Sequence, residues 1–119
     1  MNRDNRDASV LQKIVRRCDR IASSINRFGG EDVLKTDEDY KDSAAMNILQ
    51  IGELTTHLSD EFKALHSEIP WQDIKRMRNV AAHGYDKFEH KYMWGTMTED
   101  VPALREFCVR IIRQHSDAG

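Results

Sequence analysis

Apolar residues recur in the first quarter of the chain at the spacing of an α-helix. Between residues 10 and 28 they fall at steps of one, three and four, which places them on one stripe of a long amphipathic helix. The stripe consists of Val10, Leu11, Ile14, Val15, Cys18, Ile21, Ala22, Ile25 and Phe28. Because Gly29 and Gly30 supply a stop signal directly afterwards, we predict a helix over residues 4–28.

The same spacing predicts a second long helix and a short third one. Thr36, with Asp39 three residues later, suggests an N-cap, so the second helix is expected over about residues 37–58. Its apolar stripe is Tyr40, Ala44, Ile48, Ile51, Leu54, Thr55 and Leu58. Ser59 then opens a short helix that ends before Pro70. The apolar residues of that short helix are Phe62 and Leu65.

Two more helices are predicted in the second half of the chain. Pro70 begins a fourth helix that Gly84 stops, and its inward residues are Trp71, Ile74, Met77, Val80 and Ala81. After a loop with a short turn around residues 90–94, we expect Thr98 to cap a last helix that has Pro102 in its first turns. The stripe of this helix is Val101, Leu104, Phe107, Cys108, Ile111 and Ile112.

These patterns together predict one all-α domain. No run alternates apolar and polar residues with the period of two that a strand requires. A length of 119 residues suits a single domain, and no period of 20–50 residues repeats. We therefore expect residues 1–119 to form an up-and-down four-helix bundle with an additional short helix.

Composition narrows the class of protein. The chain carries no apolar run of 18 residues and begins without the apolar segment of a signal peptide, so we expect a cytoplasmic protein without a membrane contact. Cys18 and Cys108 each lie inside an apolar helical pattern, which indicates small buried side chains rather than a disulfide framework.

The charge is unevenly distributed although the net charge is only −2. Residues 1–30 hold seven basic and three acidic residues, whereas residues 31–70 hold three basic and ten acidic ones. The cations of the first helix share one face, at Lys13, Arg16, Arg17, Arg20 and Arg27. By default such a face is solvated; the alternatives are contact with RNA phosphates or docking onto an acidic partner.

The residues whose side chains are best suited to catalysis lie at the end of the predicted fourth helix. Arg78, Asn79, His83 and Tyr85 fall within eight residues. On a continuous helix Asn79 and His83 share a face, whereas Arg78 and His83 diverge by about 140°. For both to meet one substrate, the helix must end or loosen around Ala82, or the substrate must lie across the helix end. Without further context, such an Arg and His are ordinary surface and capping residues.

The pattern Arg-x4-His-x-Tyr, with Asn79 directly after the Arg, resembles the motif of HEPN-superfamily proteins, specifically the HepT-like toxins that pair with minimal nucleotidyltransferase (MNT) antitoxins. The preceding Ile-Pro-Trp at residues 69–71 and the Ile-Gly-Glu at residues 51–53 resemble further family segments. The resemblance extends over most of the chain, in its length and in its order of helices.

This resemblance implies a HEPN-type helical bundle that dimerises about the motif helices. It also implies a type VII toxin, a metal-independent endoribonuclease with Arg78 and His83 as catalytic residues. Tyr85 would be the hydroxyl to which the antitoxin transfers AMP. The antitoxin would use ATP and Mg²⁺, while this chain would bind no cofactor and no metal. Its RNA substrate, a tRNA or an mRNA, is not specified.

The chemistry of RNA cleavage leads to a related expectation. Cleavage without a metal needs a base for the 2′-OH, an acid for the leaving 5′-oxygen and a cation for the charge on phosphorus. One motif supplies a single His, so a two-fold homodimer would provide both proton-transfer groups. Asn79 and Tyr85 would support the site by orienting His83 or contacting the phosphate. Further RNA-binding candidates are Lys75, Arg76, Arg16 and Arg20.

Two alternatives remain open. The chain could be a non-catalytic HEPN module that scaffolds, or binds substrate for, a nucleotidyltransferase. Separately, Glu53 and His57 lie four residues apart on the predicted second helix and could bind a metal ion, but no third ligand has a suitable spacing.

Overall fold

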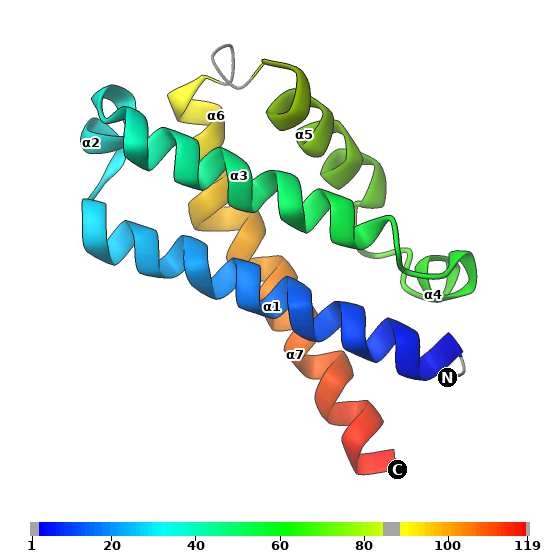
Figure 1. Ribbon diagram of the computed structural model, residues 1–119. Helices are drawn as coiled ribbons and strands as arrows, with labels where there is room; N and C mark the ends of the chain where they lie inside the picture. The colour runs from blue at the N-terminus through cyan, green and yellow to red at the C-terminus, as the bar shows by residue number, and fades with distance from the viewer. Residues whose placement is uncertain (1–2, 85–88, 119) are drawn as a thin grey trace.

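The framework of the protein is a bundle of four long helices (Figure 1). The computed structural model describes the backbone of residues 3–84 and 89–118, and the side chains of residues 6–83 and 89–115. The described part contains no β-strand, so the predicted all-α class is confirmed. The long helices are α1 (Arg3–Phe28), α3 (Glu38–Thr55), α5 (Trp71–Gly84) and α7 (Val101–Ala118).

The long helices alternate in direction along the bundle, and α1 packs against α3 and α7 while α3 also packs against α5 (Figure 1). The core between them is apolar because each helix turns its stripe inward. On α1 and α3 the fully buried residues include Leu11, Ile14, Ile21, Ile48 and Ile51. On the other helices the core residues include Ile74, Met77, Met93, Met97, Leu104 and Phe107.

The corner between α1 and α3 fixes how these two helices meet. Helix α1 ends at Phe28 as predicted, and Gly29 adopts a φ of +123°, a conformation that residues with a side chain rarely adopt. The buried hydroxyl of Tyr40 donates a hydrogen bond to the carbonyl of Gly29 at 2.8 Å, and its ring stacks on Phe28. Burial raises the pKa of Tyr40, so this hydroxyl keeps its proton.

The start of the second long helix differs from the prediction. A short helix, α2 (Glu31–Thr36), precedes it, and Leu34 is the residue that α2 buries. Thr36 therefore ends a helix instead of capping one. The N-cap of α3 is Asp37, whose carboxylate accepts from the amide of Tyr40 at 3.0 Å. Six residues with one buried side chain are too few to produce a helical period, which is why the sequence pattern missed α2.

The predicted second helix is also too long at its other end, because α3 ends at Thr55 rather than at residue 58. The hydroxyls of Thr55 and Thr56 donate to the carbonyls of Gly52 and Glu53, and such side-chain bonds compete with the helical ladder. The next helix, α4 (Asp60–Leu65), begins after Ser59 as predicted. Of the two apolar residues of this helix, Phe62 is buried and Leu65 is 77% exposed.

The last helix begins earlier than the sequence indicated. Helix α6 (His90–Gly95) continues through a π-helical segment, η2 (Thr96–Asp100), directly into α7. Thr98 is no cap, because its hydroxyl donates to the carbonyl of Trp94 within the helix. The amide of Val101 donates to the carbonyl of Thr96, five residues back. This widened turn lies immediately before Pro102, which lacks an amide hydrogen and crowds the preceding turn.

Cys18 and Cys108 are both buried and unbonded, as predicted. Burial is the main cause that raises the pKa of each thiol to about 12. Both thiols are therefore neutral at physiological pH and act as small apolar side chains in the contact between α1 and α7.

Candidate functional site

Helix α5 presents the residues that the sequence singled out. It begins after Pro70, whose carbonyl accepts from the amides of Asp73 and Ile74. Ring nitrogen Nε1 of Trp71 donates to the carbonyls of Lys63 and His66, which ties the start of α5 to α4. The inward stripe of α5 thus sets its rotation and leaves Arg78 and Asn79 partly exposed and His83 exposed.

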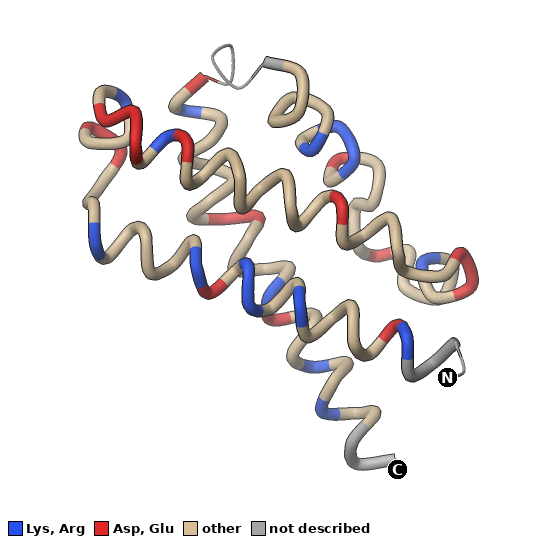
Figure 2. The backbone as a smooth tube through the Cα atoms, in the orientation of Figure 1, with Lys and Arg blue, Asp and Glu red and all other residues tan. Residues whose placement is uncertain are grey.

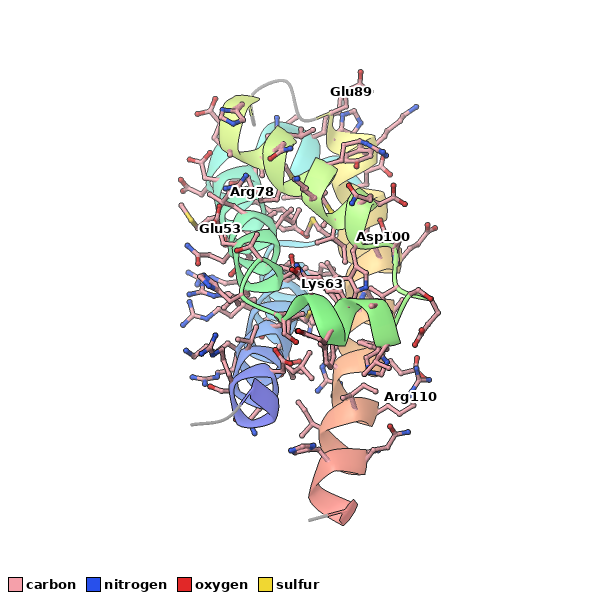
Figure 3. All side chains as sticks on the ribbon, turned by 90° about the vertical axis from the view of Figure 1, so that its right-hand side faces the viewer. Glu53, Lys63, Arg78, Glu89, Asp100 and Arg110 are labelled. Atoms are coloured by element: carbon pink, nitrogen blue, oxygen red, sulfur yellow. The ribbon has the colours of Figure 1, made fainter. Side chains whose placement is uncertain are left out.

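Arg78 lies against α3, where it contacts Glu53 (Figure 3). Its Nε donates to Oε1 of Glu53 at 2.6 Å, and its Nη2 lies 2.5 Å from the same oxygen. Its Nη1 donates to Oδ1 of Asn79 at 2.9 Å. The Arg78 side chain is 31% exposed and that of Glu53 is 41% exposed. The guanidinium is therefore held on two sides while it remains open to solvent.

Gly52 makes the close approach of α3 and α5 possible. A Cβ atom at this position would lie 2.2 Å from Cβ and 2.5 Å from Cγ of Arg78. Non-bonded carbon atoms are normally about 3.5–4.0 Å apart, so no other amino acid fits here without a shift of a helix. The glycine thus allows Glu53, the next residue, to reach Arg78.

Sequence reasoning did not identify the contact between Glu53 and Arg78. The two residues are 25 positions apart, and no spacing rule connects separate helices. The one local signal was an isolated glycine inside a strongly helical pattern, which commonly indicates a tight packing contact. Glu53 was noted as part of the Ile-Gly-Glu segment and was given a chemical role only as a metal ligand with His57; its carboxylate instead binds Arg78. Among the described residues, no group of three His, Cys, Asp or Glu side chains is placed to hold a metal ion.

His83 is exposed in the last turn of α5, and the helix is continuous up to Gly84. Of the two alternatives, a helix that ends or loosens around Ala82 is therefore not observed, and the stripe of α5 packs on the core as far as Ala81. On this helix His83 points about 140° away from Arg78. A single chain does not bring the two side chains to one face. Tyr85 lies outside the described residues.

Asn79 is bonded to Arg78, and in the described part of the chain no hydrogen bond joins it to His83. Lys75 is exposed and lies about 60° around α5 from Arg78. Arg76 lies on the opposite side of the helix, about 160° from Arg78, where it pairs with Asp73 at 2.9 Å.

Arg76 and Asp73 line a cavity of about 500 Å³ between α5 and the junction of η2 with α7. Asp100 lies on the same cavity, and burial, followed by the charges of Glu99 and Asp73, raises its pKa. In Figure 3 Asp100 lies on the side of the molecule away from Arg78. The cavity is thus separate from the motif face.

A second hollow, of about 260 Å³, lies between α3 and the end of α5. It is lined by Asp42, Ala45, Met46, Leu49 and Ala81. Met46 is 52% exposed, a large value for an apolar side chain. The contact between α3 and α5, where Arg78 lies, is therefore bordered by a partly apolar surface near the end of α5.

Basic positions recur along α1 (Figure 2), and its exposed face is more basic than its sequence suggests. The carboxylate of Asp7 is buried and accepts from the amide and hydroxyl of Ser59, at 3.0 and 2.9 Å. Asp19 is bonded to Nε of Arg105 on α7 at 2.6 Å. Both acidic side chains of α1 that the structure describes are therefore hydrogen-bonded to other parts of the chain. The exposed Lys13, Arg16 and Arg20 have no ion pair within the described residues, and Arg17 contacts the neutral Asn47 of α3.

None of the described helices is both long and apolar enough to cross a membrane. The chain is an all-α domain with a partly exposed Arg78 and an exposed His83 on α5, and the family comparison places it in the HEPN superfamily. The family model "Ribonuclease HepT-like" matches residues 14–111, so the chain belongs to the HepT-like family.

Individual relatives agree with this assignment. The chain is 40% identical over 55 residues to "Probable ribonuclease HepT" of Thermococcus cleftensis, a match that covers 46% of this chain and 50% of that protein. It is 26% identical over 104 residues to "Putative RNase TTE0752" of Caldanaerobacter subterraneus, which covers 87% of this chain and 92% of the relative. No solved structure matches the chain significantly.

Proposed function

We propose that the chain is a metal-independent endoribonuclease, the toxin of a type VII HepT/MNT pair that acts in the cytoplasm. The observation that carries this proposal is the HepT-like match over residues 14–111, which includes Arg78 and His83. The exposure of both side chains supports it, since an RNA backbone can reach them.

In the proposed reaction, one neutral imidazole removes the proton of a ribose 2′-OH, and the 2′-oxygen attacks the adjacent phosphorus. The bond from phosphorus to the 5′-oxygen breaks, and the second histidine, present as the protonated imidazolium, gives its proton to that oxygen. The products are a 2′,3′-cyclic phosphate and a 5′-OH end. Arg78 donates to the phosphate oxygens, whose negative charge increases in the transition state. No metal takes part in this scheme.

The geometry of α5 favours a homodimer for this reaction. Each chain has one motif His, and on α5 it points away from Arg78, so a second copy must complete the site. The hollow lined by Met46 and Ala81, with its exposed apolar surface beside α5, fits a contact with that copy. We propose that two motifs face each other there, with one His83 acting as base and the other as acid.

The test uses the purified chain and a mixed RNA substrate in buffer with EDTA. The proposal expects fragments with cyclic phosphate ends, and growth arrest when the chain is expressed without an antitoxin. The second candidate, a non-catalytic HEPN module, rests on the same fold but expects neither result. Absence of cleavage and of toxicity in the dimeric protein would favour that second candidate.

We propose Tyr85 as the acceptor of AMP from the cognate nucleotidyltransferase, which would bind ATP and Mg²⁺ itself. Tyr85 follows the end of α5, close in sequence to His83, so an anionic adenylyl group there would repel RNA. We expect incubation with the nucleotidyltransferase and ATP to add one or more AMP masses to the intact protein. Tyr85→Phe should abolish this addition, while Tyr92→Phe, at an exposed tyrosine of α6, should keep it. Modification of Tyr85→Phe at the native level would refute the assignment.

We further propose that the basic face of α1, with Arg16 and Arg20, extends the RNA contact. Removing both cations in Arg16→Gln/Arg20→Gln should weaken binding of single-stranded RNA and lower the slope of log K against log salt by about 1.4, since each phosphate contact contributes about 0.7. Fluorescence anisotropy with an uncleavable 2′-O-methyl RNA measures both quantities.

The matched control for this surface is Lys35→Gln/Lys41→Gln, which removes the same charge from the acidic α2–α3 region. It should leave the salt slope nearly unchanged, because α2 and α3 carry Glu31, Asp32, Glu38 and Asp39 in their first turns, in a region with many acidic positions (Figure 2). If the α1 variant binds RNA normally but loses its complex with the nucleotidyltransferase, α1 is a protein-docking surface and the RNA proposal fails.

A further inference from the structure

We infer that Glu53 is a positioning residue, which orients Arg78 so that its remaining N–H groups face the substrate phosphate. This inference rests on the proposed ribonuclease function. It adds a residue of α3 to the candidate site, whose motif residues all belong to α5 or follow it directly in sequence.

The contacts define the orientation of the guanidinium. Nε of Arg78 donates to Oε1 of Glu53, Nη1 donates to Oδ1 of Asn79, and Nη2 forms an ion pair with the same Glu53 oxygen at 2.5 Å. The two hydrogen bonds use two of the five N–H groups of an arginine, one on Nε and one on Nη1. The second N–H of Nη1 and at least one N–H of Nη2 remain available, and the side chain is 31% exposed. Two such donors match two oxygens of one phosphate, the bidentate arrangement that arginine favours.

A contribution to folding stability does not explain the ion pair of Glu53 with Arg78. Both side chains are about one-third exposed or more, and ion pairs of this kind contribute little to folding. Yet the fold places a glycine at position 52 to admit the contact, where a Cβ atom would collide with Arg78. An orienting role accounts for both facts, since an arginine that is already fixed loses less freedom when the phosphate binds.

The first test compares kcat and KM for RNA cleavage in Glu53→Ala and Glu53→Gln. Gln keeps an oxygen that can accept from Nε, so Glu53→Gln should stay within about threefold of the native kcat. Ala removes the acceptor, and misplaced catalytic groups cost on the order of 10- to 100-fold, mainly in kcat. The matched control is Asp73→Ala, which frees Arg76 on the same helix and should leave kcat within about twofold.

The second test is independent of catalysis. In ¹⁵N NMR spectra of the free protein, the Nε–H signal of Arg78 is the one absent in Arg78→Lys. This signal should be protected from exchange with water in the native chain and in Glu53→Gln, and lost in Glu53→Ala. If the native chain cleaves no RNA, the proposed function fails, but this signal and the affinity for 2′-O-methyl RNA still test the positioning.

Three outcomes would overturn the inference. The first is an Arg78 signal that is unchanged in Glu53→Ala. The second is a kcat in Glu53→Ala equal to or above the native value, which would make Glu53 neutral or a competitor of the phosphate. The third is equal loss of kcat in Glu53→Gln and Glu53→Ala, which would assign the effect to the negative charge of Glu53 rather than to the orientation of Arg78.

Discussion

Replacing His83 by Ala is expected to lower kcat for RNA cleavage by about 10²–10⁴-fold, the usual contribution of a proton-transfer group. The expected stability change is within about 0.5 kcal/mol, because the side chain is exposed in the last turn of α5. Initial rates on a short labelled RNA measure the first quantity, and urea unfolding measures the second. The combination separates a catalytic loss from a folding defect.

The control for this prediction is His57→Ala, which removes an exposed histidine just beyond the end of α3. It should cleave RNA at the native rate. If His83→Ala remains fully toxic on expression and cleaves RNA normally, the proposed mechanism is wrong. If the native chain and His83→Ala are both inactive and harmless, the non-catalytic HEPN module becomes the better account of the motif.

The second large effect is expected for Gly52→Ala. The new Cβ would lie 2.2 Å from Cβ of Arg78 and 3.3 Å from its Cα, so a rotation of the side chain does not relieve the contact. Helices α3 and α5 must move apart, and overpacking of this kind costs about 1–3 kcal/mol of unfolding free energy. Since Glu53 then no longer reaches Arg78, RNA cleavage should fall as well.

Gly95→Ala is the matched control, a change of the same size inside another helical segment. Gly95 has helical dihedral angles of −59° and −42°, and a Cβ there would meet nothing within 4 Å. We expect this variant to gain about 0.5–1 kcal/mol, because alanine favours the helix over glycine. Chemical denaturation of both variants tests the pair. Native stability in Gly52→Ala would contradict the close packing of α3 on α5.

The candidate site was only partly predictable. Arg78, Asn79 and His83 were singled out because they lie close together in sequence and resemble the HepT-like motif, and the helical spacing gave their relative directions. The partner of Arg78 was not, since Glu53 comes from another helix and is brought to it by the rotation of α3 and α5 about the core. Likewise no local pattern shows what the acidic residues of α1 contact, because Asp7 is bonded to Ser59 and Asp19 to Arg105, both far away in sequence.

The sequence by itself determined the all-α class, the four long helices and most of the core, because helical periodicity and stop signals such as Gly29 and Gly84 are local properties. The tertiary structure decided the rest. The widened turn before Pro102, the separation of Arg78 from His83 on a continuous α5, and the contact of Glu53 with Arg78 all follow from how the helices pack on one another. Packing joins residues that are distant in sequence, and no local pattern specifies those contacts.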